Sequence, residues 1–246
     1  EEARDVLTRL VEPDGSAYPM VLYALGYIAA QLDDDGTARD LYARASQMNP
    51  EYCFPYRLEE MLILEHARSV RPDDPWIAYY LGNLCYDKKR YDEAVALWER
   101  SVEINPDFSI PWRNLGVAYF NVEEDPDRAI ASYKKAFSVN PGDGRVLSEL
   151  DQLRRRTGVS PETRLEALEA HMDLVRSRDD LSVEIATLYN QTGQPQKALD
   201  YLLSRRFHPW EGGTGLVSRQ YVKAHLLLGR EELEDGNAEA ALEHFE

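Results

Sequence analysis

The chain has 246 residues, of which 43% are hydrophobic and 29% are charged, and its formal net charge is −16. The length is enough for about six or seven helix pairs, and the absence of alternating β-branched runs argues against a sheet. The negative charge disfavours nucleic acid and membranes as partners, because both select basic patches. Cys53 and Cys85 lie in apolar surroundings, so we interpret them as reduced core thiols of a cytoplasmic protein.

The first predicted unit is a pair of helices over residues 19–50. Apolar or small residues recur at i, i+3, i+4 and i+7, which predicts one apolar stripe along each helix. Gly26 and Ala38 mark the closest approach of the two helices, because larger side chains would hold them apart. Asn49-Pro50 ends the unit, since proline lacks an amide hydrogen and favours an extended residue before it.

Further units follow along the chain. Residues 51–72 hold about one helix and a half, which predicts a shortened repeat. Clear copies of the first unit are predicted over residues 75–106 and 109–141, and each ends at an Asn-Pro pair. Degenerate copies cover residues 144–176 and 179–206. A last copy over residues 216–246 stops in mid-helix, so we expect the array to continue in a longer parent chain.

The residues of the copy at 109–141 resemble the signature of a tetratricopeptide repeat (TPR) in order and spacing. Such repeats of about 34 residues are helix-turn-helix units that bury their apolar faces against neighbouring units. The resemblance implies an all-α fold, a right-handed superhelical solenoid of antiparallel helix pairs, as a single TPR-like array over residues 1–246. The matching residues are Trp112, Leu115, Gly116, Tyr119, Ala129, Tyr133, Ala136 and Pro141.

An aromatic groove is predicted when residues are numbered within each repeat. In arrays of this kind the second, fifth, ninth and twelfth residues of the first helix face the concave surface. Aromatic rings stack on peptide side chains or sugars, and an arginine beside an amide can hold a carboxylate or hydroxyl. The alternative is that Trp76 and the tyrosines pack against adjacent repeats as core. The candidates are Tyr23, Tyr27, Trp76, Tyr79, Asn83, Tyr86, Arg113 and Phe120.

The predicted groove differs from that of chaperone-binding TPR domains, which hold a C-terminal carboxylate with a lysine and paired asparagines. Tyr79 occupies the position of that lysine, and no asparagine pair is predicted. We therefore do not expect binding of chaperone tails.

A second candidate is the loop around Phe207, His208, Trp210 and Glu211. It lies between two helical segments and combines bulky aromatic residues with three glycines, so no helix can run through it. Because large exposed aromatic side chains are unfavourable, we expect an ordered loop, and its aromatic residues make it a candidate binding loop. The alternative is that Phe207 and Trp210 fill the junction between two repeats.

Nothing in the sequence predicts a catalytic residue, a cofactor or a metal site. The five histidines form no His-x-x-x-His pair, and the two cysteines form no Cys-x-x-Cys pair. A Gly-x-Ser-x-Gly elbow and a phosphate-binding glycine-rich loop are also missing from the sequence. We therefore expect a binding protein rather than an enzyme.

A narrower resemblance combines the loop at 207–213 with three other segments. The chain resembles a bacterial family in which a β-rich, glycosidase-like domain of unknown function precedes a TPR array. This resemblance implies that the chain is the C-terminal helical region of a larger protein. Our leading prediction is a non-catalytic scaffold that binds a protein or peptide, or its own N-terminal domain, through the groove and the loop. The alternative is an accessory region of a carbohydrate-active enzyme that contributes to glycan binding. The other segments are Arg113-Asn114-Leu115-Gly116, residues 147–153 and Arg178-Asp179-Asp180-Leu181.

Overall fold

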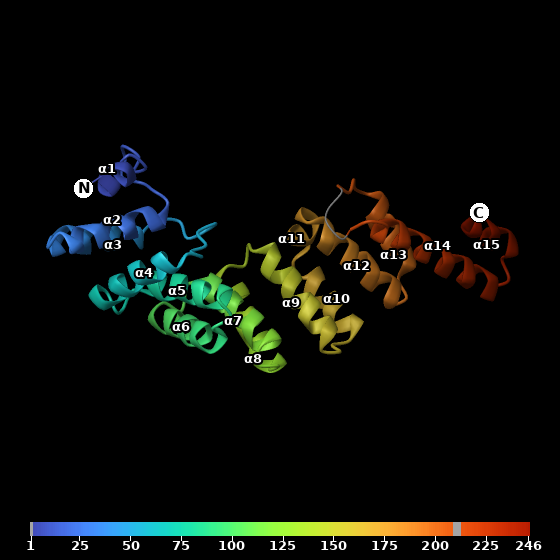
Figure 1. Ribbon diagram of the computed structural model, residues 1–246. Coiled ribbons are helices and arrows are strands. Elements are labelled where there is room, and N and C mark those ends of the chain that lie inside the picture. Colours follow the sequence, from blue (N-terminus) through green and yellow to red (C-terminus); the bar gives the residue numbers. More distant parts are fainter. Residues whose placement is uncertain (1, 209–212) are drawn as a thin grey trace. The chain divides into compact units, whose positions relative to one another are not determined.

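The computed structural model describes residues 2–208 and 213–246, and within these residues every regular element is an α-helix (Figure 1). The predicted all-α class is confirmed. Contacts between residues divide the chain into two units, Glu1–Val139 and Asn140–Glu246.

The first unit contains three pairs of adjacent helices, α2 with α3, α5 with α6, and α7 with α8. Each pair lies within one of the ranges in which a clear repeat is predicted. Helix α4 contacts α2 and α5, and an extended segment takes the place of a helix before it. The helices are α1 (Glu2–Thr8), α2 (Pro19–Gln31), α3 (Asp35–Ala45), α4 (Leu58–Val70), α5 (Pro75–Asp87), α6 (Tyr91–Ile104), α7 (Ser109–Asn121) and α8 (Pro126–Val139).

A glycine of the first helix faces an aromatic ring of the second helix in each of these pairs. An added Cβ at Gly82 would lie 2.5 Å from the Trp98 ring, closer than a real Cβ comes to another atom. Glycine is therefore needed for the close approach of the helices. The same relation recurs in the second unit. The combinations are Gly26 with Tyr42, Gly82 with Trp98, Gly116 with Tyr133, and Gly229 with Phe245.

The helices of the second unit vary more in length, from six residues in α11 to 19 residues in α14. The second helix predicted within residues 144–176 is divided into two by a break at Ala170 and His171. Side chains of Asp143 and Ser160 cap the helices that follow them by accepting backbone N–H groups. The helices are α9 (Gly144–Arg156), α10 (Pro161–Glu169), α11 (Met172–Ser177), α12 (Asp179–Gln191), α13 (Pro195–Leu203), α14 (Leu216–Glu234) and α15 (Ala238–Phe245).

A buried ion-pair cluster joins three helices of the second unit. Arg164 of α10 is 3% exposed, and its guanidinium donates to both carboxylate oxygens of Asp151 on α9, at 3.0 and 2.6 Å. The same guanidinium also donates to Glu184 of α12. Because a buried charge is tolerated only when it is paired, these contacts specify how the three helices pack.

The stability of the second unit is expected to depend on pH through Asp180. Burial acts to raise the pKa of this carboxyl, but hydrogen bonds from Arg178 and Ser148 outweigh it and hold the pKa below its usual value. A lowered pKa stabilises the folded state above about pH 4, and this contribution is lost as the pH falls through the folded pKa. Urea unfolding should therefore show that the stability difference between the wild type and Asp180→Asn shrinks below about pH 4. A difference that stays constant from neutral to acid pH would contradict this assignment.

Candidate functional site

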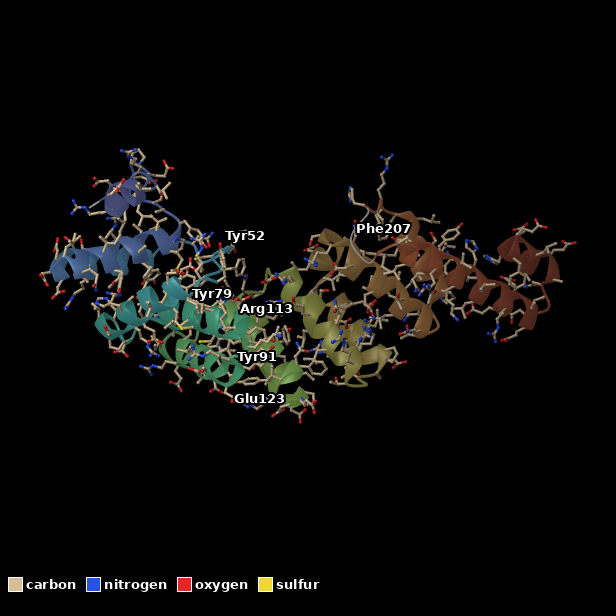
Figure 2. The ribbon with its side chains drawn as sticks, viewed as in Figure 1. Tyr52, Tyr79, Tyr91, Arg113, Glu123 and Phe207 are labelled. Carbon is tan, nitrogen blue, oxygen red and sulfur yellow. The ribbon has the colours of Figure 1, made fainter. Side chains whose placement is uncertain are left out.

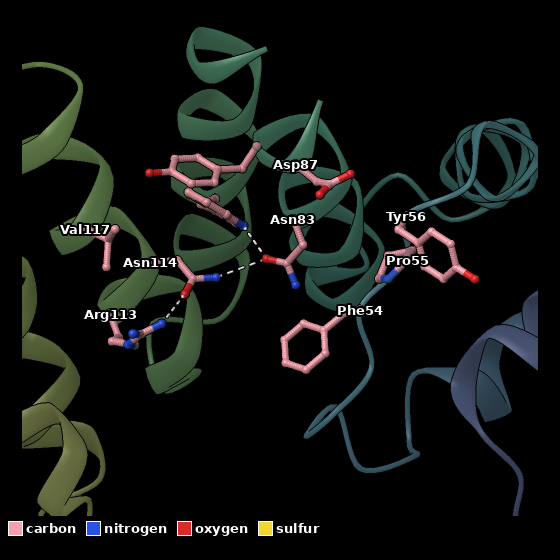
Figure 3. A pocket seen from close by; sticks show the side chains of 10 residues that line it. Phe54, Pro55, Tyr56, Asn83, Asp87, Arg113, Asn114 and Val117 are labelled. Carbon is pink, nitrogen blue, oxygen red and sulfur yellow. Dashed lines mark hydrogen bonds between the residues drawn. The ribbon is translucent and has the colours of Figure 1, made fainter. Parts of the chain in front are cut away.

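A pocket of about 340 Å³ lies in the first unit, between the segment before α4 and the helices α5, α6 and α7 (Figure 3). Its size falls within the range of small-ligand sites. Three residues of the predicted groove, Asn83, Tyr86 and Arg113, meet in it. The lining residues are Phe54, Pro55, Tyr56, Asn83, Tyr86, Asp87, Trp98, Arg113, Asn114 and Val117.

One wall of the pocket belongs to the extended segment 53–56, which follows a turn at Tyr52, and exposed and buried residues alternate along residues 52–56. Tyr52, Phe54 and Tyr56 are 85%, 61% and 56% exposed, whereas Cys53 is fully buried and Pro55 is also buried. This alternation is typical of an extended chain, which Pro55 also favours at the residue before it. Burial raises the pKa of the Cys53 thiol, so it stays protonated and anchors the segment. Phe54 and Tyr56 are thus held at the pocket, while Tyr52 extends away from it (Figure 2).

The floor of the pocket is a chain of hydrogen bonds between side chains of three helices (Figure 3). Trp98 Nε1 of α6 donates to Asn83 Oδ1 of α5 at 3.1 Å, and Asn114 Nδ2 of α7 donates to the same oxygen at 3.0 Å. Arg113 Nη1 donates to Asn114 Oδ1 at 3.3 Å. An amide oxygen accepts about two hydrogen bonds, so Asn83 Oδ1 is saturated.

The amide nitrogen of Asn83 is buried and makes no hydrogen bond of normal geometry, although its contact with the Tyr79 hydroxyl acts to lower the pKa of Tyr79 against the effect of burial. It points to the side of the pocket where Phe54 and Pro55 lie (Figure 3). An unsatisfied buried donor costs about 1–3 kcal/mol. A ligand oxygen that reached Asn83 Nδ2 would remove this cost, so the site is suited to an acceptor.

The pairing of Asn83 with Asn114 corrects a prediction. The sequence predicts a groove without paired asparagines, but these two side chains are joined by a hydrogen bond across 31 positions of sequence. Asn114 follows Arg113 and is not at a position expected to face the concave surface. Only the lateral packing of α5 and α7 places its amide at the pocket.

Tyr23 and Tyr79 belong to the core, and their prediction as groove residues was wrong. Tyr23 is 0% exposed, its ring lies 6.1 Å from the Tyr42 ring, and its edge-to-face contact with Tyr80 is 5.9 Å. Tyr79 is 2% exposed and its ring lies 5.1 Å from the Phe108 ring. Large aromatic side chains fill the space between neighbouring helices, which is the alternative that the sequence left open.

The other three predicted groove residues are half-buried and lie outside the pocket. Tyr27 contacts the His66 ring of α4 edge-to-face at 5.5 Å, and Trp76 stacks on Phe108 at 4.7 Å. Phe120 lies near the end of α7. Phe54 and Tyr56 were not predicted as site residues. The alternating pattern of residues 52–56 was the signal in the sequence that could have identified them.

The predicted binding loop is described only in part. The Arg205 guanidinium lies 4.8 Å from the centroid of the half-buried Phe207 ring, and the backbone N–H of His208 donates to Asp179 at 2.8 Å. Trp210 and Glu211 lie outside the described residues. Ligand binding by this loop therefore remains a hypothesis.

Among residues 2–208 and 213–246, no group of three or more His, Cys, Asp or Glu side chains could hold a metal ion. In the same residues, no helix is long and apolar enough to cross a membrane.

The helix pairs and their glycine contacts agree with a comparison of the chain with known families. The family model for the TPR repeat matches residues 82–122, the stretch that contains both asparagines of the pocket. Residues 82–122 of the chain therefore carry a TPR repeat. The match to a specific bacterial family with a glycosidase-like domain finds no support in these comparisons.

Solved structures share the fold. The crystal structure of YrrB, described as a TPR protein with an unusual peptide-binding site, is 17% identical and has a TM-score of 0.53. The alignment covers 74% of this chain and 88% of YrrB. The structure of Naa15/Naa10 bound to HypK-THB is also 17% identical, with a TM-score of 0.54 and coverage of 92% of this chain and 30% of that chain. At this identity the likeness shows the fold alone, a helical solenoid.

A characterised relative matches only a short part of the chain. The peroxisomal targeting signal receptor of Saccharomyces cerevisiae is 30% identical over 78 residues, which is 32% of this chain. The match spans 13% of the length of that receptor.

Proposed function

We propose that this TPR protein is a non-catalytic scaffold that binds a peptide segment of a protein partner, or of an adjoining domain, in the pocket of its first unit. The hydrogen-bonded pair Asn83 and Asn114 at the floor of an aromatic pocket carries this proposal. Side-chain amides recognise the backbone of an extended peptide, and aromatic walls accommodate its side chains.

Two similar proteins support the choice of a peptide as ligand. YrrB is described as having a peptide-binding site, and the yeast relative is named as a receptor for a targeting signal. Glycan binding as an accessory of a carbohydrate-active enzyme receives no such support and is not proposed further. The buried free thiols of Cys53 and Cys85 favour a reducing compartment, so we place the scaffold in the cytoplasm.

Selection of binders from a displayed random peptide library tests this proposal. Val117→Arg places a long charged side chain in the pocket, so we expect it to weaken the selected peptides by at least about tenfold. The matched control is Ala131→Arg, which adds the same side chain at an exposed position of α8 outside the pocket. Binding by titration calorimetry should be unchanged in the control.

Two results would overturn the pocket as the binding site. The first is that the library yields no peptide that binds the chain. The second is that selected peptides bind Val117→Arg and the wild type with equal affinity, while circular dichroism shows that both are folded.

A further inference from the structure

Several hydrogen-bonding groups of the pocket already have partners, whereas a buried donor at its floor has none. Asn83 Oδ1 already accepts from Trp98 and Asn114, and Asn114 Oδ1 accepts from Arg113. The carboxylate of Asp87 at the pocket is paired with Lys88 at 2.8 Å. In contrast, the donor Asn83 Nδ2 is unused. A ligand that brings an acceptor to Asn83 Nδ2 therefore fits the pocket, because it would satisfy a buried donor at the floor.

The walls of the pocket restrict the ligand further. Phe54 and Tyr56 on the extended segment face the pocket from one side, and Tyr86 and Trp98 line it from α5 and α6. The Tyr86 and Trp98 rings are themselves packed together, with centroids 5.3 Å apart. Rings of this kind pack against flat aliphatic rings, and Phe54 is exposed enough to move aside for a ligand.

We infer that the pocket binds a proline-rich segment in the extended polyproline II conformation, an inference that rests on the proposed function of the pocket. Proline carries a carbonyl acceptor and no backbone N–H, so such a segment can supply an oxygen to Asn83 Nδ2 without burying an unsatisfied amide. Its pyrrolidine rings pack against the aromatic walls, as in other grooves that recognise proline-rich peptides. Its rigid backbone loses little conformational freedom on binding.

A C-terminal carboxylate is the main competing ligand, because it also consists of acceptors. Arg113 lies at the pocket and would favour a negative charge. However, a single carboxylate would leave the aromatic walls without a partner. The experiment separates the two ligands by the charge at the peptide end.

The test measures binding of a short, fluorescently labelled proline peptide with acetylated and amidated ends to the whole chain by fluorescence anisotropy. We expect binding that weakens at least about tenfold when the prolines are replaced by alanine. Asn83→Asp keeps an oxygen for Trp98 and Asn114 but replaces the free donor by an acceptor, so it should weaken the proline peptide by about tenfold or more.

Variants of the extended segment provide a second test that does not disturb the floor. Phe54→Ala combined with Tyr56→Ala should weaken the proline peptide by about tenfold, because it removes one aromatic wall. Tyr52→Ala is the matched control, since Tyr52 is an exposed aromatic residue directly before the same segment that does not line the pocket. It should leave the affinity unchanged.

The possible outcomes separate this inference from the proposed function. If library-selected peptides bind in the pocket but the proline peptide does not, or binds no better than its alanine version, the inference is overturned and the peptide-binding function stands. If only the peptide with a free C-terminal carboxylate binds, the ligand is an acidic chain end and the inference is again overturned. If no peptide of any kind binds, the proposed function itself fails.

Discussion

Arg164→Met is expected to lower the free energy of unfolding by about 3–5 kcal/mol, because it leaves a buried carboxylate without a counter-charge. Asp151 is 2% exposed and receives two hydrogen bonds from Arg164. Methionine fills a similar volume, so the loss of stability would come from the unpaired charge and not from a cavity. Urea unfolding followed by circular dichroism measures the effect.

A neighbouring arginine supplies the matched control for Arg164. Arg155 pairs with Glu184 at 3.1 Å, as Arg164 also does, but its side chain is 53% exposed. Arg155→Met should therefore change the free energy of unfolding by no more than about 1 kcal/mol. The combined change Arg164→Met and Asp151→Leu should recover much of the stability, because it removes the buried charge as well. Equal losses for the two single variants would contradict the role assigned to burial.

Gly82→Ala is expected to destabilise the first unit by about 1–3 kcal/mol through overpacking. The added Cβ would lie 2.5 Å from the Trp98 ring, which is 3% exposed and hydrogen-bonded to Asn83, so the ring has little room to move. The same substitution should weaken peptide binding, since displacement of Trp98 disturbs the floor of the pocket. Thermal unfolding and titration calorimetry measure the two effects.

Gly36→Ala is the control for the change at Gly82. Gly36 also lies in a helix, but an added Cβ would meet only the Asp34 carboxylate at 3.8 Å. Alanine is a better helix former than glycine by about 1 kcal/mol, so this variant should be as stable as the wild type or more stable. A loss of stability at Gly36 as large as at Gly82 would show that the contact with Trp98 is not the cause.

Much of the fold could be predicted because its determinants are local in sequence. Pro19 and Pro75 begin helices, and the glycine-to-aromatic spacing within each pair reports a close approach of two helices that are neighbours along the chain. Three members of the pocket, Asn83, Tyr86 and Arg113, could also be predicted, since they occupy positions of the first helix of a repeat that face the concave surface.

The parts of the site that were missed depend on contacts between distant residues. The backbone pattern of residues 52–56 does not show which helix the segment lies against, so Phe54 and Tyr56 were not assigned to the pocket. Periodicity likewise does not distinguish a tyrosine that faces a groove from one that fills the space between repeats. Tyr23 and Tyr79 follow the groove pattern, yet both are buried.

The sequence by itself therefore determined the helical class and the TPR-like repeat, because propensity, capping and short-range periodicity act within about one repeat. The tertiary structure decided which side chains form the binding site. The hydrogen bond between Asn83 and Asn114 joins different repeats, and the buried pair of Arg164 and Asp151 joins different helices. Such contacts form only when helices pack side by side. Buried polar groups are stable when they are hydrogen-bonded, and the neighbouring helix supplies the partner.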